Sequence, residues 1–245
     1  VGHSHVKNGV TPVAPSPVAI KGQQHFTMDG MKDYEVPRVL VLEDIQSIIQ
    51  QYKQAAINAI DAGFDGVELH AAFGYLPNQF LAESANQRTD QYGGSHENRN
   101  RFVVEILTEM VQAIGANRVA VRISPTSTYN SIRHENPIEQ FHLLVKELNN
   151  LPLAYLHIMN VPFAVDQLPH YPLNSVEEFG KESVHPVIAN CGYNKASGEA
   201  ELNSGIATMI SFGTLFLANP DLPKRFELDA ELNALDQSTM YGGQD

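Results

Sequence analysis

Apolar and polar residues follow a helical period in some segments of the chain and form short apolar runs in others. Apolar side chains recur every three or four residues over 42–62, and Gly63 follows where a helix C-cap belongs. The next segment, FDGVELHAA, is a short apolar run bounded by glycine, which is typical of a buried parallel strand. The pattern predicts a helix over about 42–62, followed by a strand around Val67.

The same helix-then-strand pattern is repeated four more times. Strands are expected near Val121, Leu156, Val187 and Ile210, and the helices that precede them are expected at about 97–114, 137–148, 175–181 and 197–204. The segment PDLPKRFELDAELN then predicts a short helix or turn. Because the strands are far apart in sequence and separated by helices, the alternation favours an α/β fold with a parallel sheet.

The strand count leaves two architectures open. Residues 1–40 are punctuated by prolines and glycines and are predicted to be loop, so five strands remain. A closed (β/α)8 TIM barrel needs eight. Five strands suit either an incomplete barrel or an open, doubly wound sheet, and the pattern alone does not separate them.

Composition and charge narrow the function classes. The chain has 245 residues, 43% of them hydrophobic, and a net charge of −12. Such an acidic chain is unsuited to a nucleic-acid groove or an anionic membrane surface, so neither is expected as a partner. No apolar stretch is long enough to span a membrane, and the lone Cys191 excludes an intrachain disulfide. We expect a soluble, cytoplasmic protein.

Polar and aromatic side chains follow the strand around Val67. His70 lies near the end of this strand, and Tyr75 comes shortly after it. In parallel α/β folds the residues just past the carboxyl ends of strands line the ligand crevice. These two side chains are therefore predicted to face a substrate. The alternatives are a core histidine with satisfied hydrogen bonds and a tyrosine packed beneath a loop.

A longer motif begins at His70. The segments HAAFGYLPNQF (70–80) and RTDQYGGSHENRNRF (88–102) resemble the signature of the old yellow enzyme family. The similarity extends through TPVAPSPVAI, VAVRISP, AYLHIMN and FGTLFLANPDLPKRF, and so covers essentially the whole chain. The resemblance implies a (β/α)8 TIM barrel that binds FMN and takes NADH or NADPH as reductant.

The resemblance also implies an activity. Members of this family use the flavin to deliver hydride to an activated alkene, such as an enone, because no protein side chain can carry hydride. His70 matches a side chain that binds the substrate carbonyl, and Tyr75 matches the proton donor. A tyrosine hydroxyl suits that role, since it keeps its proton near neutral pH and gives it up only to a strongly basic, enolate-like carbon.

Further positions match the cofactor and substrate sites of the family. Arg122 matches the arginine beside the flavin pyrimidine ring, with an ion pair at the barrel mouth as its alternative role. The turns Cys191–Gly192 and Gly213–Thr214 match the FMN phosphate cradle, in which backbone N–H groups bind phosphate. Tyr241 matches an aromatic residue near the substrate, although it also lies in what reads as a tail.

The chain departs from the family pattern in its organisation. Nothing in it matches strands 1 and 2 or most of strand 3 of the barrel. We therefore expect one partial barrel domain, with the loop after strand 3 at 1–40, βα units at 41–228 and a carboxyl-terminal tail at 229–245. Its open edges and apolar interior would favour association, including a homo-oligomer.

Two single residues also depart from the pattern. Phe73 stands where the family places the second carbonyl-binding side chain, His or Asn, and loss of such a donor typically lowers the rate by about 10²–10³. An apolar ring there would instead suit a bulky or differently polarised alkene. Thr214 replaces an arginine that pairs with the FMN phosphate, and Lys195 is a candidate substitute for that charge.

Two alternative functions remain. The departures favour a degenerate or truncated paralogue that binds no FMN and is inactive. A different phosphate-binding barrel, such as an aldolase, is disfavoured because no strand end carries a lysine suited to Schiff-base chemistry. The remaining histidines have no metal-ligand spacing, so no metal site is expected.

Overall fold

The structure is a computed structural model that describes residues 2–163 and 167–240. Most of the chain forms alternating helices and parallel strands. The bounds in chain order are: η1 (Ser4–Val6), β1 (Val13–Ala14), β2 (Gln24–Thr27), β3 (Gly30–Asp33), β4 (Arg38–Val39), α1 (Leu42–Asp61), β5 (Val67–Ala71), α2 (Leu76–Leu81), α3 (His96–Ile114), β6 (Val119–Ile123), η2 (Tyr129–Ser131), α4 (Pro137–Leu148), β7 (Leu156–Met159), α5 (Ser175–Gly180), β8 (Val187–Asn190), α6 (Lys195–Asn203), β9 (Met209–Ser211), α7 (Thr214–Ala218) and α8 (Leu222–Leu228).

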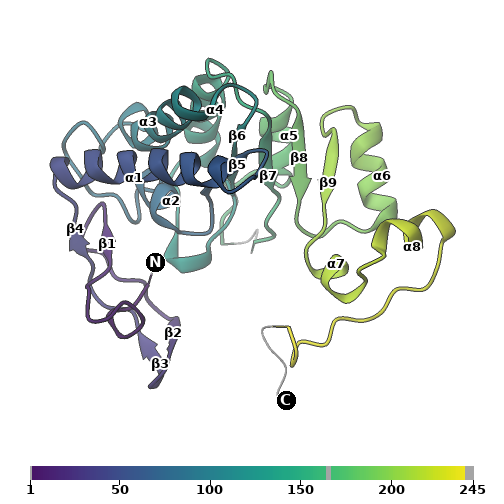
Figure 1. Cartoon of the computed structure of the whole chain (residues 1–245), viewed down its shortest axis with the longest axis horizontal. Helices are drawn as coiled ribbons and strands as arrows, with labels where there is room; N and C mark the ends of the chain where they lie inside the picture. Colours follow the sequence, from purple (N-terminus) through teal and green to yellow (C-terminus); the bar gives the residue numbers. More distant parts are fainter. Residues whose placement is uncertain (1, 164–166, 241–245) are drawn as a thin grey trace.

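The main sheet separates the two architectures that the sequence left open. Strands β5 to β9 are all parallel, and they lie side by side in the order in which they occur in the chain (Figure 1). A doubly wound sheet has a switch point at which the strand order reverses. The sequential order has no such reversal, and right-handed crossovers then place the helices that connect successive strands on one face, as in a barrel. The sheet therefore has the topology of an incomplete barrel.

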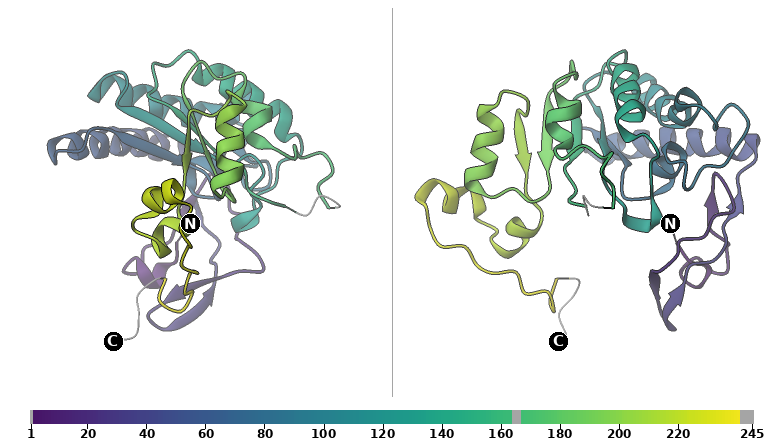
Figure 2. Two further views of the ribbon diagram at one scale, coloured as in Figure 1. Left: turned by 90° about the vertical axis from the view of Figure 1, so that its right-hand side faces the viewer. Right: turned by 180° about the vertical axis from the view of Figure 1, so that it is seen from behind.

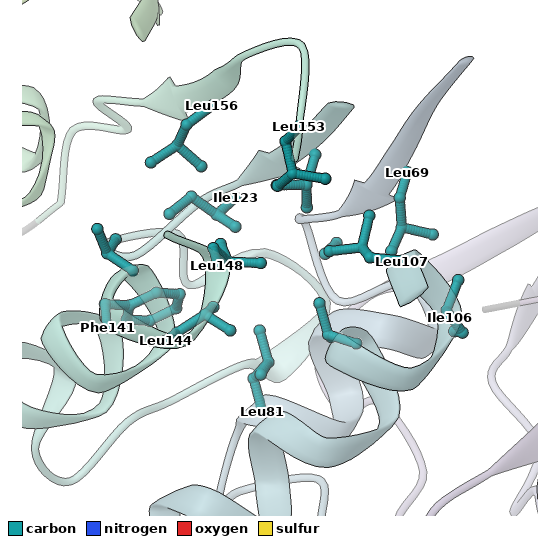
Figure 3. Packing of buried hydrophobic residues seen from close by; sticks show 14 of the residues in the cluster. Leu69, Leu81, Ile106, Leu107, Ile123, Phe141, Leu144, Leu148, Leu153 and Leu156 are labelled. Atoms are coloured by element: carbon teal, nitrogen blue, oxygen red, sulfur yellow. The ribbon is translucent and has the colours of Figure 1, made fainter. Parts of the chain in front are cut away.

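The two faces of the strands differ in chemistry. Alternate strand residues, such as Leu69, Ile123 and Leu156, are almost fully buried and pack against Leu107 of α3 and Leu144 of α4 (Figure 3). The residues between them point to the opposite face, where half-buried polar side chains gather: Glu68, His70, Arg122, Asn190 and Ser211. The helix side is thus the hydrophobic core, and the inner face carries the polar side chains of the strands together with apolar ones such as Ile188 and Met209.

Local capping explains where several helices begin and end. The Ser95 hydroxyl accepts a hydrogen bond from the Asn98 N–H at the start of α3, and Gly115, at φ 93°, ends that helix. Asn136 and Asn194 cap α4 and α6 in the same way. Among the described residues, no helix is both long and apolar enough to cross a membrane.

Residues 1–40 are not wholly loop, which corrects the prediction for this segment. Strand β1 pairs in parallel with β4, and β2 and β3 form an antiparallel hairpin. The segment is fastened to the barrel by Arg88, which donates hydrogen bonds to the carbonyl oxygens of Pro15 (3.1 Å) and Leu40 (2.6 Å). Lys21 also contacts Ser131, in the loop after β6. Residues 2–40 therefore lie beyond the carboxyl ends of the strands, at the same end of the sheet as α7 (Figures 1 and 2).

Candidate active site

Three aromatic side chains converge beyond the end of β5. The ring of His70 lies 5.2 Å from that of Tyr75 and 6.3 Å from that of Phe73, measured between centroids, and the Phe73 ring is stacked at 25° to the imidazole. Tyr129, from the loop after β6, meets Phe73 edge-on at 6.2 Å. The structure thus brings together the three residues that the sequence placed in this crevice. Tyr75 is 43% exposed, so a ligand can reach it.

The backbone at Phe73 is strained and firmly held. Phe73 has φ 52°, a left-handed conformation that costs a residue with a Cβ about 1–2 kcal/mol. Its N–H donates to the Ser124 hydroxyl (3.0 Å), and its carbonyl accepts from the Asn130 amide (2.8 Å). A Cβ on the next residue, Gly74, would lie 2.5 Å from Cβ of Asn130, so that position requires glycine. These contacts fix the direction of the Phe73 side chain.

The electrostatic environment keeps His70 neutral. Burial, and after it the positive charge of Arg122, lowers the pKa of His70 below its ordinary value. A neutral imidazole keeps one N–H that can donate a hydrogen bond. His70 is therefore suited to donate to an oxygen atom rather than to carry a positive charge.

Arg122 lies beside His70 on the inner face. The two residues are paired in the register of β5 and β6. The Nε atom of Arg122 is 2.6 Å from Oε1 of Glu68, so the ion pair that was the alternative role for this arginine is present. Arg122 also reaches Cys191 electrostatically: burial raises the pKa of that thiol, and the arginine lowers it in part. Strand β6, which carries Arg122, lies between β5, which carries His70, and β8, which ends at the turn with Cys191.

The turns after the last two strands line one cavity of about 580 Å³. Cys191 and Gly192 have φ values of 79° and 78°, so the chain turns sharply after β8. Gly213 and Thr214 form the facing turn after β9. The four predicted cradle residues are thus brought together, and the cavity lining comprises Pro162, Asn190, Cys191, Gly192, Tyr193, Asn194, Ser211, Phe212, Gly213, Thr214 and Leu215.

One predicted position does not contribute to this site. Lys195, the candidate substitute for the missing arginine, is turned away from the cradle, because its Nζ donates to the Phe226 carbonyl (2.5 Å) and to the Asp229 carboxylate. The prediction that it supplies the phosphate charge is wrong for this arrangement. Tyr241 lies outside the described residues.

A set of polar residues on the inner face was not predicted from the sequence: Glu68, His157, Asn190 and Ser211. They are linked to Arg122 by ion pairs and hydrogen bonds. A signal for two of them was present, because a strand buried on both faces reads as a continuous apolar run. Glu68 and His157 interrupt such runs at the alternate positions that face inward.

The second half of the long motif, 88–102, stabilises the fold and does not line the crevice. Arg88 pairs with Asp90 while binding the two carbonyls of the amino-terminal segment. The Asn86 amide donates to the carbonyls of Phe80 and Tyr92, at 2.7 Å each. A Cβ on Gly93 would lie 2.4 Å from the Arg88 carbonyl oxygen, so this turn also needs glycine. The specificity of this motif is therefore structural.

Glu83, in the same region, makes acid stability testable. Burial raises the pKa of Glu83, but the neighbouring His134 and the Arg99 guanidinium, whose Nη2 is 2.7 Å from Oε1, lower it to about 2 from an ordinary 4.5. A carboxyl group whose pKa is lowered by folding stabilises the fold at pH values above its pKa in the unfolded chain, about 4.5. That stability is lost as the pH falls from about 4.5 through 2. At neutral pH, Glu83→Gln should lower the free energy of unfolding by roughly 3 kcal/mol.

Urea unfolding at pH 7 and pH 2.5 tests this. The difference between wild type and Glu83→Gln should be large at pH 7 and shrink strongly at the lower pH. Glu109→Gln, which breaks the more exposed pair with Lys53, should have a much smaller effect. A pH-independent effect of Glu83→Gln would contradict the assignment.

Comparison with known proteins places the chain in a family. Residues 3–233 match the model of the NADH:flavin oxidoreductase / NADH oxidase family. The chain belongs to this family. It is 40% identical over 231 residues to putative 12-oxophytodienoate reductase 2 of Oryza sativa subsp. japonica, and this match covers 94% of the chain. It is 41% identical over 243 residues to a probable flavin mononucleotide-dependent alkene reductase of Leishmania infantum, a match that covers 97% of the chain and 65% of that protein.

Solved structures in the family agree with the fold. Morphinone reductase matches with a TM-score of 0.91 and 39% identity, over 100% of this chain and 67% of that one. The old yellow enzyme homologue of Zymomonas mobilis matches with a TM-score of 0.91 and 38% identity, over 99% and 68%. The chain spans about 61% of the length of the first rice relative. The resemblance seen in the sequence is confirmed.

Proposed function

We propose that this chain forms the last five βα units of an FMN-dependent NAD(P)H oxidoreductase that reduces activated alkenes of the enone type. The observation that carries the proposal is the convergence of His70, Tyr75 and Arg122 at the carboxyl ends of neighbouring strands, beside a cavity lined by two turns. Membership of the flavin oxidoreductase family supports it. On this proposal, residues 1–245 form a single partial barrel domain, in which 41–228 supply the βα units.

The residues present fit FMN. The cavity of about 580 Å³ lies in the range usual for ligand sites, about 300–1,000 Å³. We propose that the turns Cys191–Gly192 and Gly213–Thr214 would hold the phosphate through backbone N–H groups, and that Arg122 would bind the flavin ring. When bound, FMN supplies the hydride chemistry, with NADH or NADPH as reductant.

The protein side chains then have separate tasks. Neutral His70 donates a hydrogen bond to the substrate carbonyl oxygen, which draws electron density away from the alkene. Tyr75, within the same cluster, supplies a proton to the substrate carbon. Phe73 has no hydrogen-bond donor and presents an apolar ring instead, so His70 alone polarises the carbonyl.

FMN titration of the purified chain, followed by quenching of flavin fluorescence, tests the proposal. Gly192→Ala and Gly205→Ala form a matched pair, since both glycines have φ 78° and neither has another atom within 4 Å of an added Cβ. The two variants should suffer similar backbone strain, but only Gly192 lines the cavity. We expect Gly192→Ala to weaken FMN binding by about tenfold or more, or 1.4 kcal/mol, and Gly205→Ala to leave it unchanged. Equal effects would remove the cradle assignment.

Restoring a positive charge to the cradle should strengthen FMN binding. Thr214 lines the cavity at the first residue of α7. A charge-assisted hydrogen bond contributes roughly 1.5–3 kcal/mol, so Thr214→Arg should lower the Kd for FMN by about 10- to 150-fold. Leu217→Arg adds the same charge to the same helix at a position that is 54% exposed and away from the cavity lining. An equal gain from both variants would point to general electrostatic attraction.

A second candidate is an inactive paralogue that binds no FMN. Phe73 and Thr214 favour it, because each removes a polar contact that the family pattern supplies, and Lys195, which is engaged by Asp229, does not replace the lost charge. Purified wild-type protein that stays colourless after incubation with excess FMN would select this candidate over the first.

A further inference from the structure

A line of polar side chains crosses the inner face of the main sheet. Both carboxylate oxygens of Glu68 on β5 are engaged, one by an ion pair and one by a hydrogen bond. Oε1 lies 2.6 Å from Nε of Arg122, in an ion pair whose N–H does not have hydrogen-bond geometry, and Oε2 is 2.9 Å from Nδ1 of His157 in a hydrogen bond. The Nε2 atom of His157 is 2.9 Å from the hydroxyl of Ser211. The amide of Asn190 donates to that same hydroxyl at 2.6 Å. One connected network of side chains therefore joins β5 to β9.

This network of side chains extends from the crevice that holds His70 to the two turns of the predicted phosphate cradle. Arg122 is paired in register with His70, whereas Asn190 and Ser211 line the cavity at the ends of β8 and β9, just before its two turns. Asn190 also donates to the Ser211 backbone carbonyl at 2.9 Å, which ties the ends of β8 and β9 together. Through these contacts the position of Arg122 is coupled to the position of both turns.

The central residues of this network are buried or partly buried. His157 is 2% exposed, and the side chains of Glu68 and Arg122 are 19% and 33% exposed. Burial raises the pKa of Glu68, but His157 and Arg122 outweigh it, so the carboxylate is ionised. A buried ion pair is often no more stabilising than apolar residues of the same size, because both charges lose hydration. What such a group does provide is a fixed geometry.

That geometry favours one orientation of the guanidinium. Arg122 meets the carboxylate through Nε, the inner nitrogen, so this closest contact does not use its two terminal nitrogens. His157 is hydrogen-bonded to the other carboxylate oxygen, which restricts movement of the Glu68 side chain. Carboxylates that orient metal-bound histidines act in a comparable way.

We propose that Glu68 is a positioning residue, which, held by His157, fixes Arg122 at the mouth of the site with its terminal nitrogens free for a ligand. What Arg122 meets there rests on the proposed function. The positioning itself is a property of the chain without any ligand, and the two claims can be tested separately.

The first test uses the ligand-free chain labelled with ¹⁵N-arginine. The ¹⁵N relaxation of the Arg122 Nε–H reports whether that side chain is rigid. It should be rigid in wild type and in Glu109→Gln, which makes the same charge change on the outer helix α3. It should be mobile in Glu68→Gln. Glu68→Asp, which keeps the charge but withdraws the oxygens, should also mobilise it. An Arg122 that stays equally rigid in both Glu68 variants would overturn the proposal.

The second test measures the Kd for FMN in the same variants. FMN is an anion, so removal of a negative charge in Glu68→Gln should by itself strengthen binding, whereas loss of a fixed Arg122 should weaken it. We expect about tenfold weaker binding, by analogy with carboxylates that orient metal ligands. Tighter binding would contradict the proposal. If wild type bound no FMN at all, the proposed function would fall, while the relaxation measurement would still decide the role of Glu68.

Discussion

Replacing Tyr75 with phenylalanine should lower the rate of alkene reduction by about 10²- to 10⁴-fold, the usual contribution of a positioned proton donor. The change removes one oxygen atom and keeps the ring that lies 5.2 Å from the His70 ring. Tyr75 directly precedes α2, where it caps the helix through its backbone and not through its side chain, so the fold should be unaffected. Steady-state reduction of cyclohexenone with NADH and NADPH, in the presence of saturating FMN, measures the loss.

The matched control for Tyr75 is Tyr129. Its side chain belongs to the same aromatic cluster and is 53% exposed, but it contacts Phe73 rather than His70. Tyr129→Phe should therefore leave the rate close to that of wild type. FMN affinity should be unchanged in both variants, which separates a lost proton from a damaged cofactor site. Full turnover by Tyr75→Phe would mean that another group supplies the proton.

The periodic elements were predictable because local signals mark their ends. Helix α4 was predicted at 137–148 and is found at Pro137–Leu148, since Asn136 caps it and proline occupies its first turn. Helix α6 begins two residues earlier than expected, because the cap is Asn194. Helix α2 was missed: it has only six residues, and five of them are buried, including the polar Asn78 and Gln79, so polarity does not mark an exposed face with a helical period.

The short strands of the amino-terminal segment could not be read from the sequence for a different reason. Strands β1 and β4 have two residues each and exist only through their mutual pairing. The pairing depends on Arg88, which lies far along the chain and binds the backbone on both sides. A loop prediction based on prolines and glycines does not include such a long-range contact.

The candidate site was predictable only one residue at a time. The rule that ligands bind at the carboxyl ends of parallel strands placed His70 and Tyr75 in a crevice, and the family resemblance assigned their roles. Contacts across strands need the register of the sheet, which no local pattern supplies. Glu68 and His157 are 89 residues apart in the chain, yet they form a close pair. They come from β5 and β7, the two strands that flank β6 and its Arg122.

Phe73→Asn should have the opposite effect to the loss of Tyr75, because it should raise both stability and turnover. Asparagine tolerates a left-handed conformation better than phenylalanine does, so the strain at φ 52° should fall by about 1 kcal/mol. The amide would also supply a hydrogen-bond donor next to His70. Since one such donor changes the rate by about 10²–10³, turnover of an enone should rise by a similar factor. Thermal unfolding and steady-state kinetics measure the two effects.

Phe73→Gly separates the two contributions to that result. Glycine relieves the same backbone strain but adds no donor, and both variants remove the ring that stacks on His70 and meets Tyr129 edge-on. A gain in turnover with asparagine alone would show that the missing donor limits carbonyl polarisation in the wild-type chain. An equal gain with glycine would instead mean that the bulk of Phe73 restricts entry of the substrate. A loss of turnover in both variants, at unchanged FMN affinity, would mean that the ring itself binds the apolar part of the natural substrate. The departure from the family pattern at position 73 would then be a change of substrate specificity rather than a defect.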